Sequence, residues 1–163
     1  MTDGRFLAGV AALIRDPADH YLFLQRSITK DFAPGVWECV TGRVRQGEGY
    51  EEAMHREVAE ETGLQVEPEC LLGTTHFHRG PLKPDTELLG VVYVCHCPAP
   101  QALRLSAEHQ NARWASLQEA PAFLQADDPS TRWIRGVVRR ADRILSGLPR
   151  RWQDIARREG FSL

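Results

Sequence analysis

Three glutamates that lie close together in the sequence could bind a divalent cation. Glu57, Glu60 and Glu61 occupy positions i, i+3 and i+4, so a helix would place their carboxylates on one side within about one turn. Like charges at this spacing repel one another and weaken an isolated helix. A cation such as Mg²⁺ makes the arrangement favourable, because it prefers oxygen ligands and keeps positions open for water and phosphate. The spacing therefore indicates a metal site for a phosphorylated substrate.

The residues around the three glutamates fit such a site. Glu48 lies just before the expected helix, where a carboxylate suits the positive end of the helix dipole. Arg56 is expected to reach Glu60 one turn on and Glu52 one turn back, and so to orient a ligand carboxylate. Gly42 lies where the preceding loop must bend tightly. A merely solvated helix face is the alternative for the three glutamates taken alone.

The complete spacing resembles the signature of a known family. A glycine, five residues, a glutamate, seven residues and then Arg-Glu-U-X-Glu-Glu-X-Gly-U, where U is a bulky aliphatic residue, is typical of the Nudix hydrolases. Residues 42–64 fill every defined position, with Gly42, Glu48, Arg56, Glu57, Val58, Glu60, Glu61, Gly63 and Leu64. The resemblance implies hydrolysis of a nucleoside diphosphate linked to another group, with Mg²⁺ as cofactor and Mn²⁺ as the alternative ion.

The resemblance also implies a role for each residue of the signature. The implied metal ligands are the carbonyl oxygen of Gly42 and the carboxylates of Glu57, Glu60 and Glu61. Glu57 is the first choice for the catalytic base and Glu60 the second, while Arg56 would orient the glutamates and Glu48 would act as an outer-shell acid. Such a site suits the reaction, because a cation neutralises phosphate oxygens and lowers the pKa of water, and phosphoryl transfer depends mainly on positioning and charge stabilisation.

Three residues outside the signature are further candidates. Glu108, which precedes Trp114, lies where several family members carry an additional catalytic acid, although a surface glutamate is the alternative. Arg26, at the end of an expected strand, is a candidate for binding phosphate or is simply solvated. Trp37, just before the signature, would either stack on a substrate base or pack in the core.

The segments flanking the signature indicate a substrate class by resemblance. Residues 40–42, together with Glu108, His109 and Trp114, are similar to the dihydroneopterin triphosphate and deoxynucleoside triphosphate branch. This implies cleavage of a triphosphate to a monophosphate and pyrophosphate. Pro81 lies near the place of a proline that marks ADP-ribose-cleaving members, so ADP-ribose or another nucleoside diphosphate derivative is the alternative. Lower alternatives are an RNA-end pyrophosphohydrolase, a nonhydrolytic nucleotide-binding module and an isopentenyl diphosphate isomerase, whose cysteine motif the residues around Cys39 do not match.

Composition indicates a globular protein of one domain, residues 1–163. The chain is 42% hydrophobic and 26% charged, as expected for a folded domain of this size. Its longest apolar run, residues 6–14, is too short to span a bilayer, so we expect a cytoplasmic protein with no membrane partner. The four cysteines show no zinc-site spacing and are expected to be reduced. His76 and His78 share one face of an expected strand, but we do not assign them a metal.

Positive charge is concentrated near the C-terminus. Residues 129–163 contain nine arginines and three acidic residues, a net charge of +6. Since the whole chain has a net charge of −2, residues 1–128 have a net charge of −8. A basic surface of this kind would steer polyanions, dock against the acidic body or be a solvated helix face. Because the chain is net acidic, we expect a small nucleotide rather than nucleic acid as the partner. A homodimer is left open.

The order of the expected elements indicates an α/β fold. Strands are expected at 6–14, 21–25, 36–41, 70–78, 88–97 and 113–115, and helices at 49–62, 117–125 and 131–145. The last helix has Asp128 as its cap and Pro129 at its first position. This order differs from a Rossmann alternation. The resemblance implies a Nudix-type α/β/α sandwich around a mixed, curved sheet over about residues 5–125, with the basic C-terminal helices, about 129–163, beyond it.

Overall fold

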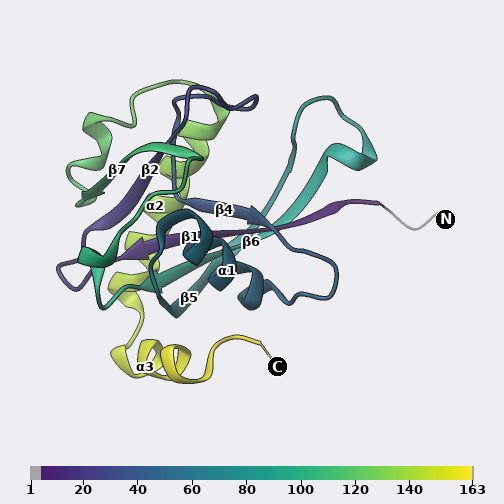
Figure 1. Cartoon of the computed structure of the whole chain (residues 1–163). Coiled ribbons are helices and arrows are strands. Elements are labelled where there is room, and N and C mark those ends of the chain that lie inside the picture. Colours follow the sequence, from purple (N-terminus) through teal and green to yellow (C-terminus); the bar gives the residue numbers. More distant parts are fainter. Residues whose placement is uncertain (1–4, 163) are drawn as a thin grey trace.

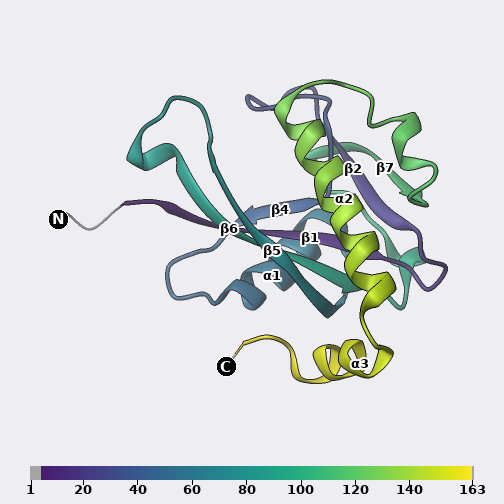
Figure 2. The same cartoon turned by 180° about the vertical axis from the view of Figure 1, so that it is seen from behind.

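A mixed, curved sheet with helices on both faces organises the chain (Figures 1 and 2). The computed structural model describes residues 5–162. Within this range the strands are β1 (Leu7–Arg15), β2 (Tyr21–Arg26), β3 (Trp37–Glu38), β4 (Val40–Arg43), β5 (Glu67–His78), β6 (Glu87–His96) and β7 (His109–Ala115). The helices are α1 (Tyr50–Thr62), α2 (Pro129–Gly147) and α3 (Arg150–Glu159). The predicted α/β fold is therefore confirmed.

The pairing of β1 brings the signature to the middle of the sheet. The strand order is β3-β2-β1-β6-β5, with β4 also paired to β1 and β7 to β2. β1 runs parallel to β6 along its whole length, and its other edge pairs antiparallel with β4, where Val10 lies opposite Gly42. The signature glycine is thus held on a strand, and the loop that follows it leads directly into α1.

The two faces of the sheet carry separate hydrophobic clusters. Successive side chains of a strand point to opposite faces, and in β1 both sets are buried, as expected for a strand covered on both sides. The α1 side buries residues such as Val10, Ala12, Ile14, Met54 and Val58. The α2 side buries residues such as Ala11, Leu13, Phe23, Ile134 and Val138. α1 and α2 therefore stabilise opposite faces, as the two views show (Figures 1 and 2).

Several predicted elements differ from those observed. The predicted helix at 117–125 is wrong, since only a single 3₁₀ turn forms, at Ala120–Ala122, and Pro121 at its centre lacks the amide hydrogen that a longer helix requires. The predicted strand at 36–41 is two short strands, β3 and β4, which pair with β2 and β1 respectively. β7 begins four residues before the predicted Arg113. The cap of α2 is confirmed, because Asp128 accepts a hydrogen bond of 2.9 Å from the amide of Thr131.

A buried ion cluster attaches α3 to the sheet. Glu69 of β5 has no exposed side-chain surface and pairs with Arg15 of β1, at 2.9 Å, and with Arg157 of α3. Burial alone would raise the pKa of Glu69, but hydrogen bonds from both arginines outweigh it and lower the pKa. Part of the basic C-terminal segment therefore docks against an acidic residue of the body.

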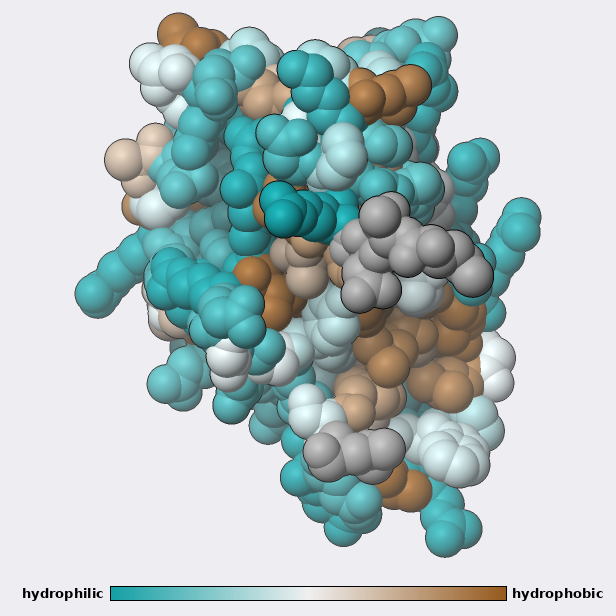
Figure 3. All heavy atoms as spheres, turned by 90° about the vertical axis from the view of Figure 1, so that its right-hand side faces the viewer, coloured by the Kyte–Doolittle hydropathy of each residue, from teal (hydrophilic) through white to brown (hydrophobic). Residues whose placement is uncertain are grey.

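None of the helices within residues 5–162 has the length and apolar character needed to cross a membrane. Seen from the side of the β5–β6 hairpin, the surface is mostly hydrophilic, with one group of hydrophobic side chains in its lower half (Figure 3). All four cysteines are free and buried.

Candidate active site

Helix α1 carries the signature glutamates, and local contacts define both of its ends. Before the helix, the amide of Gly49 donates to the carboxylate of Glu52 at 2.8 Å. At the other end, Gly63 adopts the left-handed conformation, with φ of 66°, which favours glycine. Met54 and Val58 are buried against the sheet, and the signature glutamates lie on other sides of the helix.

Arg56 joins three of the signature acids. Its guanidinium donates to both oxygens of Glu48, at 2.6 and 2.9 Å, to Glu57 at 2.7 Å and to Glu60 at 3.3 Å. The predicted contact with Glu60 is confirmed, whereas the one with Glu52 is wrong, because Glu52 turns back to bind the amide of Gly49. Hydrogen bonds from Arg56 and from the amide of Arg45 lower the pKa of Glu48 to about 2. Glu48 therefore anchors Arg56 as an ionised carboxylate.

The position of the Glu57 side chain requires a residue without a Cβ atom at position 42. A Cβ atom added to Gly42 would lie 1.9 Å from the carboxyl carbon of Glu57, which is far inside van der Waals contact. The glutamate side chain therefore packs directly against the backbone of β4. Glu60 is more exposed, at 48% of its side-chain surface, and pairs with Arg45 at 3.2 Å as well as with Arg56.

Glu61 lies in a buried acidic cluster. Only 6% of the residue is exposed, and its Oε2 atom has no hydrogen-bond partner. Burial, together with the charges of Glu38, Glu57 and Glu108, raises the pKa of Glu61 to about 9. Nε2 of His109 is 3.9 Å from Oε2 of Glu61, which is beyond hydrogen-bond distance. A buried carboxylate that lacks donors is a group that a cation would stabilise.

The structure gives the three candidates outside the signature different surroundings. Arg26 donates to Glu38 at 2.8 Å and to the carbonyl of Phe32 at 3.0 Å, so its guanidinium is held inside the protein. The ring of Trp37 lies 5.2 Å from that of Phe123 on the α2 side of the sheet, which favours the packing role.

Glu108 is close enough for its charge to act on Glu61, but its carboxylate is paired with Lys30. Lys30 donates to it at 2.6 Å and, as the main cause, lowers its pKa.

Two residues near Glu61 were not predicted as site residues from the sequence. Glu38 and His109 are joined by a contact of 3.1 Å between Oε1 and Nε2, although they are 71 positions apart in the chain. His109 directly follows Glu108 in the sequence. No local pattern, however, indicated that its ring would be buried next to Glu61.

The donor atoms suit Mg²⁺, but the side chains are not gathered as a finished metal site. Across residues 5–162, no three His, Cys, Asp or Glu side chains are arranged to hold a metal ion. The cause is that arginines hold Glu57 and Glu60, while Glu61 is turned toward His109. All the candidate donors are oxygens, which hard cations prefer, and the unpartnered Oε2 of Glu61 fits the same group. Ligation of a metal by Gly42, Glu57, Glu60 and Glu61 therefore stays a prediction.

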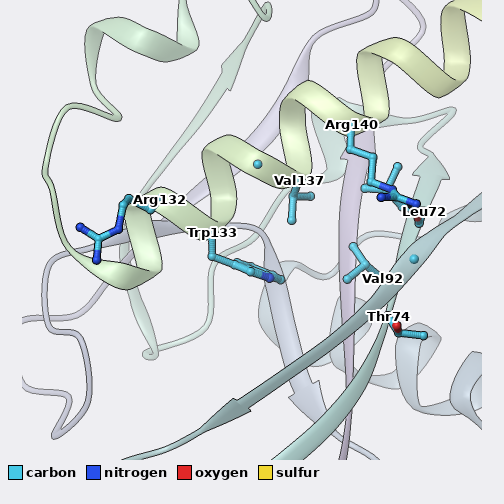
Figure 4. Close-up of a pocket in the computed structure, with 9 residues that line it drawn as sticks. Leu72, Thr74, Val92, Arg132, Trp133, Val137 and Arg140 are labelled. Atoms are coloured by element: carbon cyan, nitrogen blue, oxygen red, sulfur yellow. Dashed lines mark hydrogen bonds between the residues drawn. The ribbon is translucent and has the colours of Figure 1, made fainter.

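A separate cavity of about 350 Å³ lies between α2 and the sheet (Figure 4). Residues that line it include Leu72, Thr74, Val92, Trp133 and Arg140. In Figure 4 the ring of Trp133 points from α2 toward the strands. Arg140 donates to the carbonyl of Leu72 at 2.7 Å, so this arginine helps to pack α2 on β5. No signature residue lines the cavity, so it is separate from the glutamates of α1.

Comparison with known proteins assigns the family. The sequence profile of the NUDIX domain matches residues 5–135. The chain belongs to this family. The fold agrees with the assignment, because a MutT protein from Methanosarcina mazei Go1 superposes with a TM-score of 0.70 at 27% identity, over 88% of this chain and 97% of that one.

The curated proteins that match this chain are longer than it is. The human 8-oxo-dGDP phosphatase NUDT18 is 33% identical over 73% of this chain and 35% of that protein. The octanoyltransferase of Myxococcus xanthus is 36% identical over 53% of this chain and 24% of that protein. The chain thus spans about a quarter to a third of the length of these relatives. The likeness covers only part of each relative, so the activity of a whole relative is not transferred to this chain.

Proposed function

We propose that this NUDIX protein is a Mg²⁺-dependent pyrophosphohydrolase that cleaves the diphosphate linkage of a nucleoside diphosphate derivative. The observation that carries the proposal is the arrangement on α1, where Arg56 joins Glu48, Glu57 and Glu60 and Gly42 leaves room for the carboxyl group of Glu57. Hydroxide attack on a diphosphate is opposed by its negative charge. A bound Mg²⁺ would neutralise the phosphate oxygens and lower the pKa of the attacking water.

The residues of the chain have distinct tasks in this proposal. The carbonyl of Gly42 and the carboxylates of α1 hold the cation, and Arg56 fixes the orientation of Glu57 through the bond to Oε1. The second oxygen of Glu57 is then available to take the proton of the attacking water. Glu60 is the second candidate for this base. Glu108 is a third, although its pairing with Lys30 would first have to be broken.

As substrate we propose a nucleoside or deoxynucleoside triphosphate, or a related triphosphate, cleaved to a monophosphate and pyrophosphate. Support comes from the similarity of residues 40–42 to the triphosphate-cleaving branch. The name of the human relative gives 8-oxo-dGDP as its substrate, which is a deoxynucleotide but a diphosphate, so it supports the nucleotide class and not the triphosphate. ADP-ribose or another nucleoside diphosphate derivative is the alternative. We also propose a cytoplasmic location, in keeping with the four free cysteines. The proposed partner is a small nucleotide. Sedimentation analysis would show whether the protein forms a homodimer.

A substrate panel tests the proposal. The protein is incubated with nucleoside triphosphates, 8-oxo-dGDP, ADP-ribose, dinucleoside polyphosphates and a triphosphate-ended RNA, each with Mg²⁺, with Mn²⁺ or with EDTA. We expect metal-dependent release of a nucleoside monophosphate from at least one compound. Glu60→Gln should lose at least about 100-fold in turnover, as expected when a group that positions or activates water is removed. The control Glu67→Gln changes an exposed glutamate at the start of β5 and should retain full activity. If none of the compounds is cleaved, the proposed function is wrong.

A further inference from the structure

A chain of polar contacts leads from β2 to the most buried signature glutamate. Arg26 of β2 donates to Oε1 of Glu38 in β3 at 2.8 Å. The same oxygen lies 3.1 Å from Nε2 of His109 in β7, and that nitrogen is 3.9 Å from Oε2 of Glu61 in α1. Four elements thus meet at one point, and His109 is the link between the sheet and the catalytic helix.

The hydrogen bonding of this cluster is incomplete. Across residues 5–162, only two buried polar side-chain atoms have no hydrogen-bond partner, namely Oε2 of Glu61 and Nδ1 of His109. The imidazole is 1% exposed, so bulk solvent does not reach the ring. Buried polar atoms are almost always paired in folded proteins, and exceptions call for an explanation. Both exceptions here lie on the same pair of residues, which indicates a role for the pair beyond packing.

The backbone brings His109 to this position. The ladder between β2 and β7 is irregular at Gln25 and Arg26, and Arg26 lies opposite His109. Such irregularities redirect side chains. The loop before β7 is bonded to the end of α1, because the amide of Ser106 donates to the carbonyl of Glu61 at 3.0 Å and the amide of His109 donates to the carbonyl of Ser106 at 3.3 Å. The position of the ring relative to α1 is therefore held from both sides.

We propose that His109 is the positioning residue of Glu61, and that its Nε2–H group hydrogen bonds to Oε2 when Glu61 binds Mg²⁺ and so fixes the orientation of that carboxylate. The proposal rests on the proposed function, in which Glu61 is a metal ligand. We assign the ring proton to Nε2 because this nitrogen faces two carboxylates, whereas Nδ1 faces no partner. Carboxylates that ligate metals are themselves held by hydrogen bonds, and loss of such a partner costs about 10–100-fold in metal affinity.

Glu38 allows the imidazole to serve both carboxylates. Its Oε1 atom also accepts from Arg26 at 2.8 Å, and its Oε2 atom accepts from Thr41 at 3.4 Å. Glu38 therefore keeps two donors when Nε2–H turns toward Glu61. The movement required is small, because the nitrogen must close a gap of 3.9 Å to a hydrogen-bond distance of about 3 Å.

Three substitutions at one position test the inference. The side-chain nitrogen of glutamine lies about where Nε2 lies in histidine, the nitrogen of asparagine lies about where Nδ1 lies, and leucine has no donor. We expect His109→Gln to bind Mg²⁺ nearly as wild type does. His109→Asn and His109→Leu should bind it about 10–100-fold more weakly. The measurements are calorimetric titration with Mg²⁺ and with Mn²⁺ in the absence of substrate, the Mg²⁺ concentration for half-maximal turnover, and the KM for substrate at saturating Mg²⁺, which should not change.

Controls separate positioning from packing and from failure of the proposed function. His76→Leu changes an exposed histidine and should bind Mg²⁺ as wild type does. If Glu61→Gln keeps wild-type Mg²⁺ affinity, Glu61 is not a ligand and the proposed role of the glutamate fails. If Glu61→Gln loses affinity while His109→Asn and His109→Leu keep it, the inference about His109 alone is overturned. Equal losses of Mg²⁺ affinity in His109→Gln and His109→Asn would also overturn the inference. This comparison tests the inference even if His109→Leu does not fold.

Discussion

Replacing Gly42 by alanine should separate catalytic activity from stability. The added Cβ would lie 1.9, 2.2 and 2.3 Å from Cδ, Cγ and Oε1 of Glu57, so the glutamate side chain must leave its position. A flexible side chain can move, and we expect the free energy of unfolding to fall by only about 1–3 kcal/mol. For a protein of this length that corresponds to a Tm lower by about 2–12 °C.

The catalytic effect of Gly42→Ala should be much larger. Displaced Glu57 loses the 2.7 Å bond from Arg56, and a carboxylate misplaced by about 1 Å is expected to cost on the order of 100-fold in turnover. The assay is turnover of the substrate found in the panel, with calorimetry for Tm. The control is Gly49→Ala, because Gly49 has an extended backbone and its added Cβ would meet only Glu52, at 3.7 Å. If Gly42→Ala keeps activity equal to that of Gly49→Ala, the position of Glu57 does not govern the reaction.

Three further predictions concern the acids and arginines. The pKa of Glu61 is about 9 in the folded protein against an ordinary 4.5, so the folded state binds this proton more tightly than the unfolded state. The free energy of unfolding of the metal-free protein should therefore decrease as the pH rises from about 4.5 to about 9, as urea titrations would show. Affinity for Mg²⁺ should increase over the same range, and Glu61→Gln should remove both trends. Arg56→Lys should lower kcat at least about 10-fold, because an ammonium group does not reproduce the planar array of donors, and unchanged kcat would contradict this. Arg15→Met should cost about 3–5 kcal/mol in urea unfolding, because it removes a partner of buried Glu69, whereas exposed Arg151→Met should cost little; equal effects would contradict a buried ion pair.

The helix α1 that carries the signature could be predicted from the sequence because it depends on local spacing. Glu60 lies one turn after Arg56, so helix periodicity alone brings these two side chains together, as the structure confirms. The end of α1 at Gly63 follows from the conformational freedom of glycine, and the start of α2 follows from the cap at Asp128. The family signature, too, is a local pattern.

The partner of each remaining side chain depends on how distant strands meet. Arg26 was a candidate for phosphate, yet the pairing of β2 with β3 and β7 places its guanidinium on Glu38. His109 reaches Glu61 only because a ladder irregularity and the loop after α1 combine. Burial, which comes from the packing of all these elements, then raises the pKa of Glu61. Local propensities carry no information about strand register between distant segments, and for this reason the surroundings of the buried glutamate become visible only in the folded chain.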